Sequence, residues 1–115
     1  MTSESFSVRS ERAGRVHRVK AIGELDMATV AVLEPEFDAI DDHDAVVVVD
    51  LTELDFIDSS GLHLLLRLND RFPDRFRING SAVVERLLDI AGVRPLLPII
   101  SPTDDPLAPR TSPSA

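Results

Sequence analysis

Apolar and polar residues alternate at the start of the chain, where Phe6 and Val8 lie two residues apart. This period is typical of a strand with one buried face. The segment from Phe6 to about Ile22 therefore predicts two short strands, joined by a turn around Ala13 and Gly14. The alternation is less regular in the second of these strands.

Residues 23–40 follow with a different period, because their apolar residues recur at spacings of 3, 4 and 3. This spacing places them on one face of a helix. The residues on that face are Val30, Leu33, Phe37 and Ile40. Asp26 is placed to accept hydrogen bonds as the N-cap of this helix. Pro35 removes one helical hydrogen bond, which predicts either a kink or a regular helix that starts near Pro35.

Residues 45–51, AVVVVDL, form a run of branched apolar residues without alternation. Such a run predicts a strand buried on both faces, as in the middle of a parallel sheet. A second helix is expected from near Ser59 to just before Pro73. One face of this helix carries Leu62, Leu65, Leu66 and Asn69. The apolar stripe is broadened by Leu64, Leu68 and Phe72.

The remaining pattern predicts a short strand around Phe76 and Ile78, a third helix over residues 82–91, and a last short strand in residues 97–100. Ser81 is expected to cap the third helix and Gly92 to end it in a left-handed conformation. The residues expected to point inward are Val84, Leu87, Leu88 and Ala91. Residues 102–115 are rich in proline and poor in apolar residues, so this tail is expected to be disordered.

The predicted order of elements is β-β-α-β-α-β-α-β. It indicates an α/β fold in a single domain, residues 1–101, with a mixed, mostly parallel sheet of four to five strands and about three to four helices. In such sheets a site most often lies where strands end and helices begin. Residues 23–26, GELD, and residues 54–61, LDFIDSSG, are expected at two such turns.

Composition narrows the possible functions of the 115 residues. The chain has no Cys, Trp or Tyr, which excludes disulfides and thiolate metal sites. Its net charge of −8 would repel nucleic acids and anionic membranes. Its longest apolar runs fall far below the ~20 residues of a membrane span. We therefore expect a cytoplasmic protein with no direct nucleic-acid or membrane partner. Five early basic residues are interpreted as the solvated edge of a hairpin: Arg9, Arg12, Arg15, Arg18 and Lys20.

The seryl turn at residues 58–61 allows three interpretations. Asp58, Ser59 and Ser60 could simply cap the second helix, since such residues are favoured there. Ser59 could be a nucleophile with His63 four residues later, but no G-x-S-x-G elbow is present and no oxyanion hole is identified. The third possibility is phosphorylation, for which a helix N-terminus is locally favourable. Neither a metal-ligand set nor a nucleotide-binding loop is present, so no metal or cofactor is expected.

Three segments together resemble the STAS domain family, and within it the bacterial anti-sigma factor antagonists. They are GELD at residues 23–26, VVVVDLTELDFIDSSGLHLLL at residues 46–66, and VVERLLDIAGV at residues 83–93. The resemblance covers about residues 6–101 in the right order, and its most specific part is the strand followed by the Asp-Ser-Ser-Gly turn. It implies a STAS-like fold and a protein that is a partner-switching regulator rather than an enzyme.

The resemblance also implies roles for individual residues. Ser59 corresponds to the serine that a cognate anti-sigma factor, itself an ATP-dependent serine kinase, phosphorylates and that a serine phosphatase dephosphorylates. The unphosphorylated protein would bind the anti-sigma factor and free the sigma factor. The residues expected to contact the partner are Gly23, Asp26, Asp58, Ser60, Gly61 and His63. The alternative is a STAS subunit of a lipid-transport ATPase, which would act as a binding module without phosphorylation.

Overall fold

The computed structural model describes residues 6–101, 104 and 106 of the chain. Its elements, in order, are β1 (Ser7–Ala13), β2 (Val16–Leu25), α1 (Met27–Asp38), β3 (Val46–Ile57), α2 (Ser59–Arg71), β4 (Phe76–Asn79), α3 (Ala82–Ala91), a short 3₁₀ helix η1 (Arg94–Leu96) and β5 (Ile99–Ile100). The prediction of a disordered tail falls almost wholly outside the described residues and stays a prediction.

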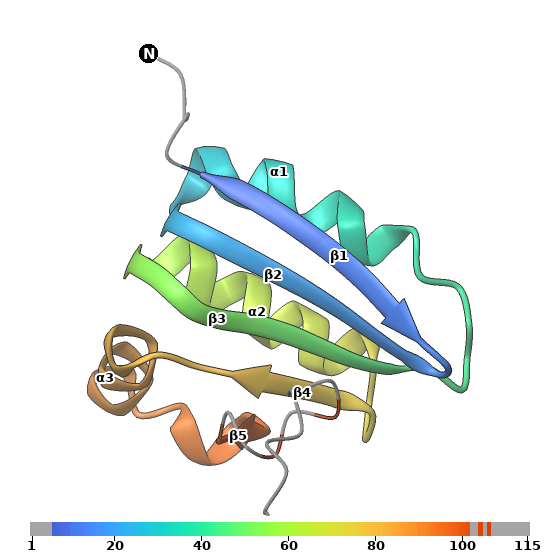
Figure 1. The fold of residues 1–115 in the computed structure, drawn as a ribbon. Helices are drawn as coiled ribbons and strands as arrows, with labels where there is room; N and C mark the ends of the chain where they lie inside the picture. The colour runs from blue at the N-terminus through green and yellow to red at the C-terminus, as the bar shows by residue number, and fades with distance from the viewer. Residues whose placement is uncertain (1–5, 102–103, 105, 107–115) are drawn as a thin grey trace, which may run out of the picture.

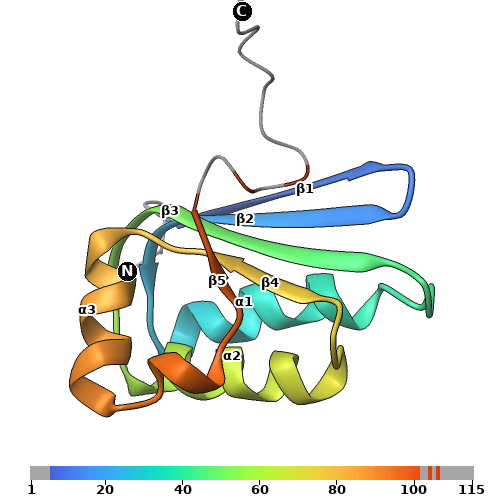
Figure 2. The same ribbon diagram turned by 90° about the horizontal axis from the view of Figure 1, so that it is seen from below.

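The strands form one five-stranded sheet in the order β1-β2-β3-β4-β5. Only the β1 and β2 pair is antiparallel, and the other neighbours are parallel. The strands follow one another in a single direction across the sheet, so right-handed crossover connections place the successive helices on the same side. Helices α1 and α2 accordingly lie side by side on one face (Figures 1 and 2). The predicted α/β fold with a mixed, mostly parallel sheet is confirmed.

The core lies between this helix-covered face and the helices. Most predicted inward positions are buried, including all four in and just after α1. Val47, Val48 and Val49 of β3 are each 0% exposed, which confirms the prediction of a strand buried on both faces. On the face opposite the helices, the register places Val48 between Arg18 and Arg77. We call this side the open face of the sheet.

Helix α3 differs from its prediction at two residues. Ala91 was expected to point inward but is exposed. Ala91 is on the same helical face as Val84 and Leu88, but it is the last residue of α3, and the buried part of that face ends at Leu88. Ser81 precedes the helix as predicted, yet its side chain makes no capping hydrogen bond. Gly92 ends the helix in the predicted left-handed conformation.

Helix α1 is continuous from Met27 to Asp38, so the prediction of a regular helix starting near Pro35 is wrong. A proline at this position leaves the carbonyl of Ala31 without its helical donor. Both Ala31 and Pro35 are on the exposed side of the helix. Water can therefore solvate the freed carbonyl, and the buried face of the helix continues without interruption.

Strands β2 and β3 extend further than the sequence pattern indicated. The segments GEL and LDFI, expected in turns, belong to the ends of these strands. Two register shifts insert extra β3 residues opposite β2, which breaks the alternation that marks a strand. Gly23 lies beside the second shift with a φ of 115°, a conformation that favours glycine. Because these bulges change which residues face inward, Leu54 and Ile57 are both buried.

Arg18 corrects the interpretation of the basic residues as a solvated edge. The side chain of Arg18 is only 18% exposed and pairs with Asp50, which is 1% exposed, and with Glu11. Asp50 also accepts hydrogen bonds from the backbone N–H and the hydroxyl of Thr52, at 2.9 and 2.6 Å. Arg9, Arg12 and Arg15 are exposed, as predicted for the edge hairpin. The open face thus contains a buried polar network between β2 and β3.

Candidate functional site

The ends of β2 and β3 bring the two predicted turns together. Leu25 pairs with Ile57 in the parallel register, and the N–H of Asp58 donates to the carbonyl of Leu25 at 3.2 Å. Asp26 and Asp58 follow these paired residues directly and are the N-caps of α1 and α2. Two helix N-termini therefore start side by side at one edge of the sheet, at the ends where the β2 and β3 arrows point in Figure 1.

Asp26 is held in place by Thr29. The N–H of Thr29 donates to Asp26 Oδ1 at 3.0 Å, and the N–H of Asp26 donates to Thr29 Oγ1 at 2.8 Å, which closes a capping box. The Thr29 hydroxyl also donates to the carbonyl of Glu24 at 2.7 Å. The hydrogen bond from the Thr29 backbone, followed by that from its side chain, lowers the pKa of Asp26. The predicted N-cap is confirmed, and these hydrogen bonds favour the ionised form of Asp26 in the folded protein.

The capping carboxylate predicts a pH dependence of stability. Since folding lowers the pKa of Asp26, its ionised form stabilises the protein fully above the unfolded value, about 4. This contribution is lost as the pH falls through the lower, folded value. Urea unfolding of the wild type and of Asp26→Asn at pH 7 and pH 3 measures it. We expect the advantage of the wild type over Asp26→Asn to be smaller at pH 3 than at pH 7; an equal difference at both pH values would contradict this.

Ser59 is the first residue of α2, and its side chain is exposed. Asp58 accepts hydrogen bonds from the N–H groups of Ser60 and Gly61, at 2.8 and 3.3 Å to Oδ1. Across the described residues, the Ser59 hydroxyl makes no hydrogen bond, whereas Ser60 is half-buried. His63 is exposed one turn later, and no bond joins it to Ser59. The seryl turn therefore presents one free hydroxyl to the surroundings, and capping belongs to Asp58.

Gly61 is a glycine for an internal reason. It is buried, and a Cβ atom at this position would lie 2.7 Å from Ile57 Cγ1 and 3.0 Å from Leu25 Cδ2. Both distances are shorter than the separation of about 3.5–4.0 Å at which two non-bonded carbon atoms are in favourable contact. Gly61 therefore lets the first turn of α2 approach the ends of β2 and β3 closely. The predicted contact of Gly61 with a partner stays a prediction, and the packing gives a separate, internal reason for glycine at this position.

We expect Gly61→Ala to destabilise the protein by about 1 kcal/mol. Overpacking costs about 1–3 kcal/mol, and the better helix propensity of alanine offsets at most about 1 kcal/mol of that. Gly80→Ala is the matched control, because the nearest atoms to a Cβ there lie at 3.6 Å. Urea unfolding should show a loss for Gly61→Ala and little change for Gly80→Ala. Equal stabilities of the two variants would mean that the contact at Gly61 relaxes at no cost.

The site is strongly acidic. No Lys or Arg lies between Lys20 and Arg67, whereas 12 of the 20 acidic residues do. Several of these carboxylates are neutralised elsewhere, for example Glu34 by Arg67 and Glu53 by Lys20. The carboxylates around the two turns have no ion pair with any described residue. They are Glu24, Asp26, Asp55 and Asp58, and no described cation neutralises them.

Sequence reasoning missed some residues of this site. Thr29 orients Asp26, and the spacing of an N-cap residue and a hydroxyl three positions later could have indicated it. Glu24 and Asp55 contribute charge, but their place depends on the bulged register. Of the predicted partner residues, Gly23 is buried in β2 and has a backbone role. Asp26, Asp58, Ser59, Ser60 and His63 lie at the paired turns.

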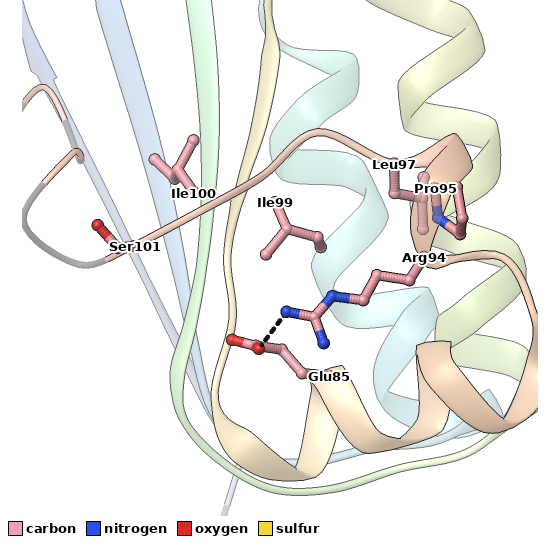
Figure 3. A pocket seen from close by; sticks show the side chains of 7 residues that line it. All are labelled: Glu85, Arg94, Pro95, Leu97, Ile99, Ile100 and Ser101. Carbon is pink, nitrogen blue, oxygen red and sulfur yellow. Dashed lines mark hydrogen bonds and ion pairs between the residues drawn. The ribbon is translucent and has the colours of Figure 1, made fainter.

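A hollow of about 420 Å³ lies elsewhere, between α3 and the segment that contains η1 and β5 (Figure 3). Its polar lining residues are Glu85, Arg94 and Ser101. Arg94 donates to Glu85 at 2.8 Å and also pairs with Asp89, which does not line the hollow. No residue of the two turns lines this hollow. In the described part of the chain, no helix is long and apolar enough to cross a membrane. Nor do three His, Asp or Glu side chains there form a group that could hold a metal ion.

Comparisons with known proteins agree with the fold described above. The family model described as Mlab, STAS domain, matches residues 8–98. An anti-sigma factor antagonist from Mycobacterium paratuberculosis has a similar crystal structure, with a TM-score of 0.74 and 25% identity over 90% of this chain and 92% of that one. The anti-sigma factor antagonist SpoIIAA in its unphosphorylated form gives a TM-score of 0.63 and 18% identity, over 83% of this chain and 89% of that one. No curated protein sequence matches the chain.

Proposed function

Because the chain belongs to the STAS domain family, we propose that it is an anti-sigma factor antagonist switched by phosphorylation of Ser59. In its unphosphorylated form it binds an anti-sigma factor that is also a serine kinase, and so releases the sigma factor in the cytoplasm. Phosphorylation of Ser59 ends this interaction, and a serine phosphatase restores it. The similarity to the mycobacterial anti-sigma factor antagonist, over most of both chains, supports the choice of partner.

The observation that carries the proposal is the position of Ser59. Its hydroxyl is exposed, makes no hydrogen bond among the described residues, and lies at the first position of α2. A kinase can therefore reach the oxygen without unfolding any element. Ser60 is half-buried, so Ser59 is the more accessible of the two serines. This difference supports the assignment of the phosphoacceptor that the family resemblance implied.

The charges around Ser59 explain how phosphorylation would act. A phosphoserine adds roughly −1.5 to −2 charges at neutral pH. Here it would join four carboxylates that no described cation neutralises: Glu24, Asp26, Asp55 and Asp58. Burying that extra charge in an interface is costly unless the partner supplies a new cation. The switch thus needs no change of fold, only a change of surface potential.

The protein itself is proposed to be a substrate and not an enzyme. A serine nucleophile needs a base within hydrogen-bonding reach and a set of oxyanion donors. His63 is four residues from Ser59, but no hydrogen bond joins the two in the structure. The nearby amides of Ser60 and Gly61 already donate to Asp58 and are not directed at a reacting atom.

The direct test is phosphorylation by purified kinases. The wild type is incubated with ATP and each serine kinase of the anti-sigma class encoded in the same genome, and the modified residue is mapped by mass spectrometry. We expect one phosphate on Ser59 from at least one kinase and none on Ser59→Ala. Phosphatase treatment should then return the unmodified mass. The proposal fails if no kinase modifies the wild type and Ser59→Ala signals like the wild type. The protein would then fit the alternative of a non-phosphorylated STAS subunit of a lipid-transport ATPase.

A further inference from the structure

Two large apolar side chains beside the seryl turn are exposed without an internal reason. Met27, the first residue of α1, is 77% exposed, and Phe56, near the end of β3, is 45% exposed. Exposed single apolar residues are common, and Leu96 is another, at 63% exposed. Met27 and Phe56 differ from it because they flank the two paired turns. Phe56 pairs with Glu24 in the sheet, and Met27 directly follows Asp26.

The apolar side chains alternate with unneutralised carboxylates along the chain. Glu24 and Asp26 precede Met27, while Asp55 and Asp58 lie on either side of Phe56 in the sequence. This combination disfavours an anionic membrane or a nucleic acid, which the carboxylates would repel. It suits a folded protein surface on which Lys or Arg side chains border an apolar recess. Interfaces of this kind concentrate their binding energy in a few large apolar or aromatic anchors.

We infer that the partner docks on the surface formed by the two paired turns, at the ends of β2 and β3 and the starts of α1 and α2. Met27 and Phe56 are the apolar anchors of this docking surface, and the partner receives them in an apolar recess bordered by basic side chains. This inference rests on the proposed function and adds the residues and the chemistry that select the partner. The carboxylates steer the approach of a basic surface and set the salt dependence of binding. The two anchors determine how slowly the complex dissociates, because they lose contact with water only when docked.

The test uses Ser59→Ala as the background, so that the kinase cannot modify the protein during the measurement. Met27→Gln and Phe56→Thr are added singly and together, and Leu96→Gln is the matched control. Leu96 lies by the far half of α2, because Asn69 donates to its carbonyl at 3.2 Å. The probe is the purified kinase that phosphorylates the wild type, and dissociation constants are measured by biolayer interferometry.

We expect Met27→Gln and Phe56→Thr each to weaken binding by about 10-fold or more, mainly through faster dissociation, and Leu96→Gln to leave it unchanged. Raising the NaCl concentration should weaken binding of the background protein, and Glu24→Gln with Asp55→Asn should reduce that salt dependence. Thermal melts of all variants check that the fold is intact.

The outcomes separate this inference from the function on which it rests. If the kinase binds the background protein and both anchor variants bind as tightly as Leu96→Gln, the anchors are wrong while the proposed function stands. If binding is lost equally in Leu96→Gln, the docking surface lies elsewhere, and the inference is overturned. If no kinase binds the background protein or phosphorylates the wild type, the proposed function fails, and the inference fails with it.

Discussion

Ser59→Asp is expected to weaken binding of the anti-sigma kinase by at least about 10-fold, which corresponds to about 1.4 kcal/mol. The substituted carboxylate would add a charge to a surface that already holds four carboxylates without an ion pair among the described residues. Like charges that meet in an interface cost up to several kcal/mol. Full phosphorylation adds more charge and should weaken binding further, by about 100-fold.

The fold should be unaffected by the same substitution. Ser59 is exposed at the first position of α2, where an acidic residue interacts favourably with the helix dipole. We therefore expect the free energy of unfolding to change by no more than about 0.5 kcal/mol. Leu96→Asp is the control, since it adds the same charge at an exposed position by the far half of α2. A pull-down and a thermal melt measure both properties. A large fall in the melting temperature of Ser59→Asp would show that the switch acts through the fold.

Arg18→Met is expected to destabilise the protein by about 3 kcal/mol, because removing one member of a buried ion pair leaves the other charge unpaired. Asp50 is that charge, with a side chain only 1% exposed. Its remaining hydrogen bonds come from Thr52 and carry no positive charge. For a domain of this size such a loss lowers the melting temperature by at least about 10 °C.

Lys20→Met provides the comparison on the same strand and the same face. Lys20 pairs with Glu53, whose side chain is 55% exposed, so water can solvate the carboxylate that remains. Exposed ion pairs contribute at most about 1 kcal/mol. Adding Asp50→Asn to Arg18→Met removes the unpaired, buried carboxylate of Asp50 and should recover part of the stability. If Arg18→Met and Lys20→Met unfold at the same urea concentration, the pair on the open face does not behave as a buried one.

The hydrophobic pattern was enough to predict most elements, because each helix buries a face with a helical period and the central strand is an unbroken apolar run buried on both faces. The face of α1 and the limits of α2 followed from local residues, as did the caps Asp26 and Asp58. Pro35 misled the prediction, since the cost of a proline depends on whether water reaches the freed carbonyl. That is decided by the orientation of the helix on the sheet, which local spacing does not contain.

The residues of the candidate site also fall into two groups, those that the sequence predicted and those that depend on tertiary contacts. The residues DSSG and GELD were recognisable in the sequence, and the order of elements indicated that both would follow parallel strands. Which other residues surround them depended on contacts between distant segments. The bulged register of β2 and β3 brought Glu24 and Phe56 together and placed Asp55 beside them. The same packing brought Leu25 and Ile57 against Gly61, which is why a larger residue there is expected to cost stability.

By itself the sequence determined the α/β fold, the helix caps Asp26 and Asp58, and the serine that begins α2, because these depend on neighbours within a few residues along the chain. Only the tertiary structure decided that Ser59 is exposed while Ser60 is half-buried, that Arg18 is paired with a buried Asp50, and that the carboxylates at the two turns lack partners among the described residues. Burial and electrostatic pairing depend on contacts between side chains that are distant in the sequence, and the pattern of apolar and polar residues along the chain does not specify those contacts.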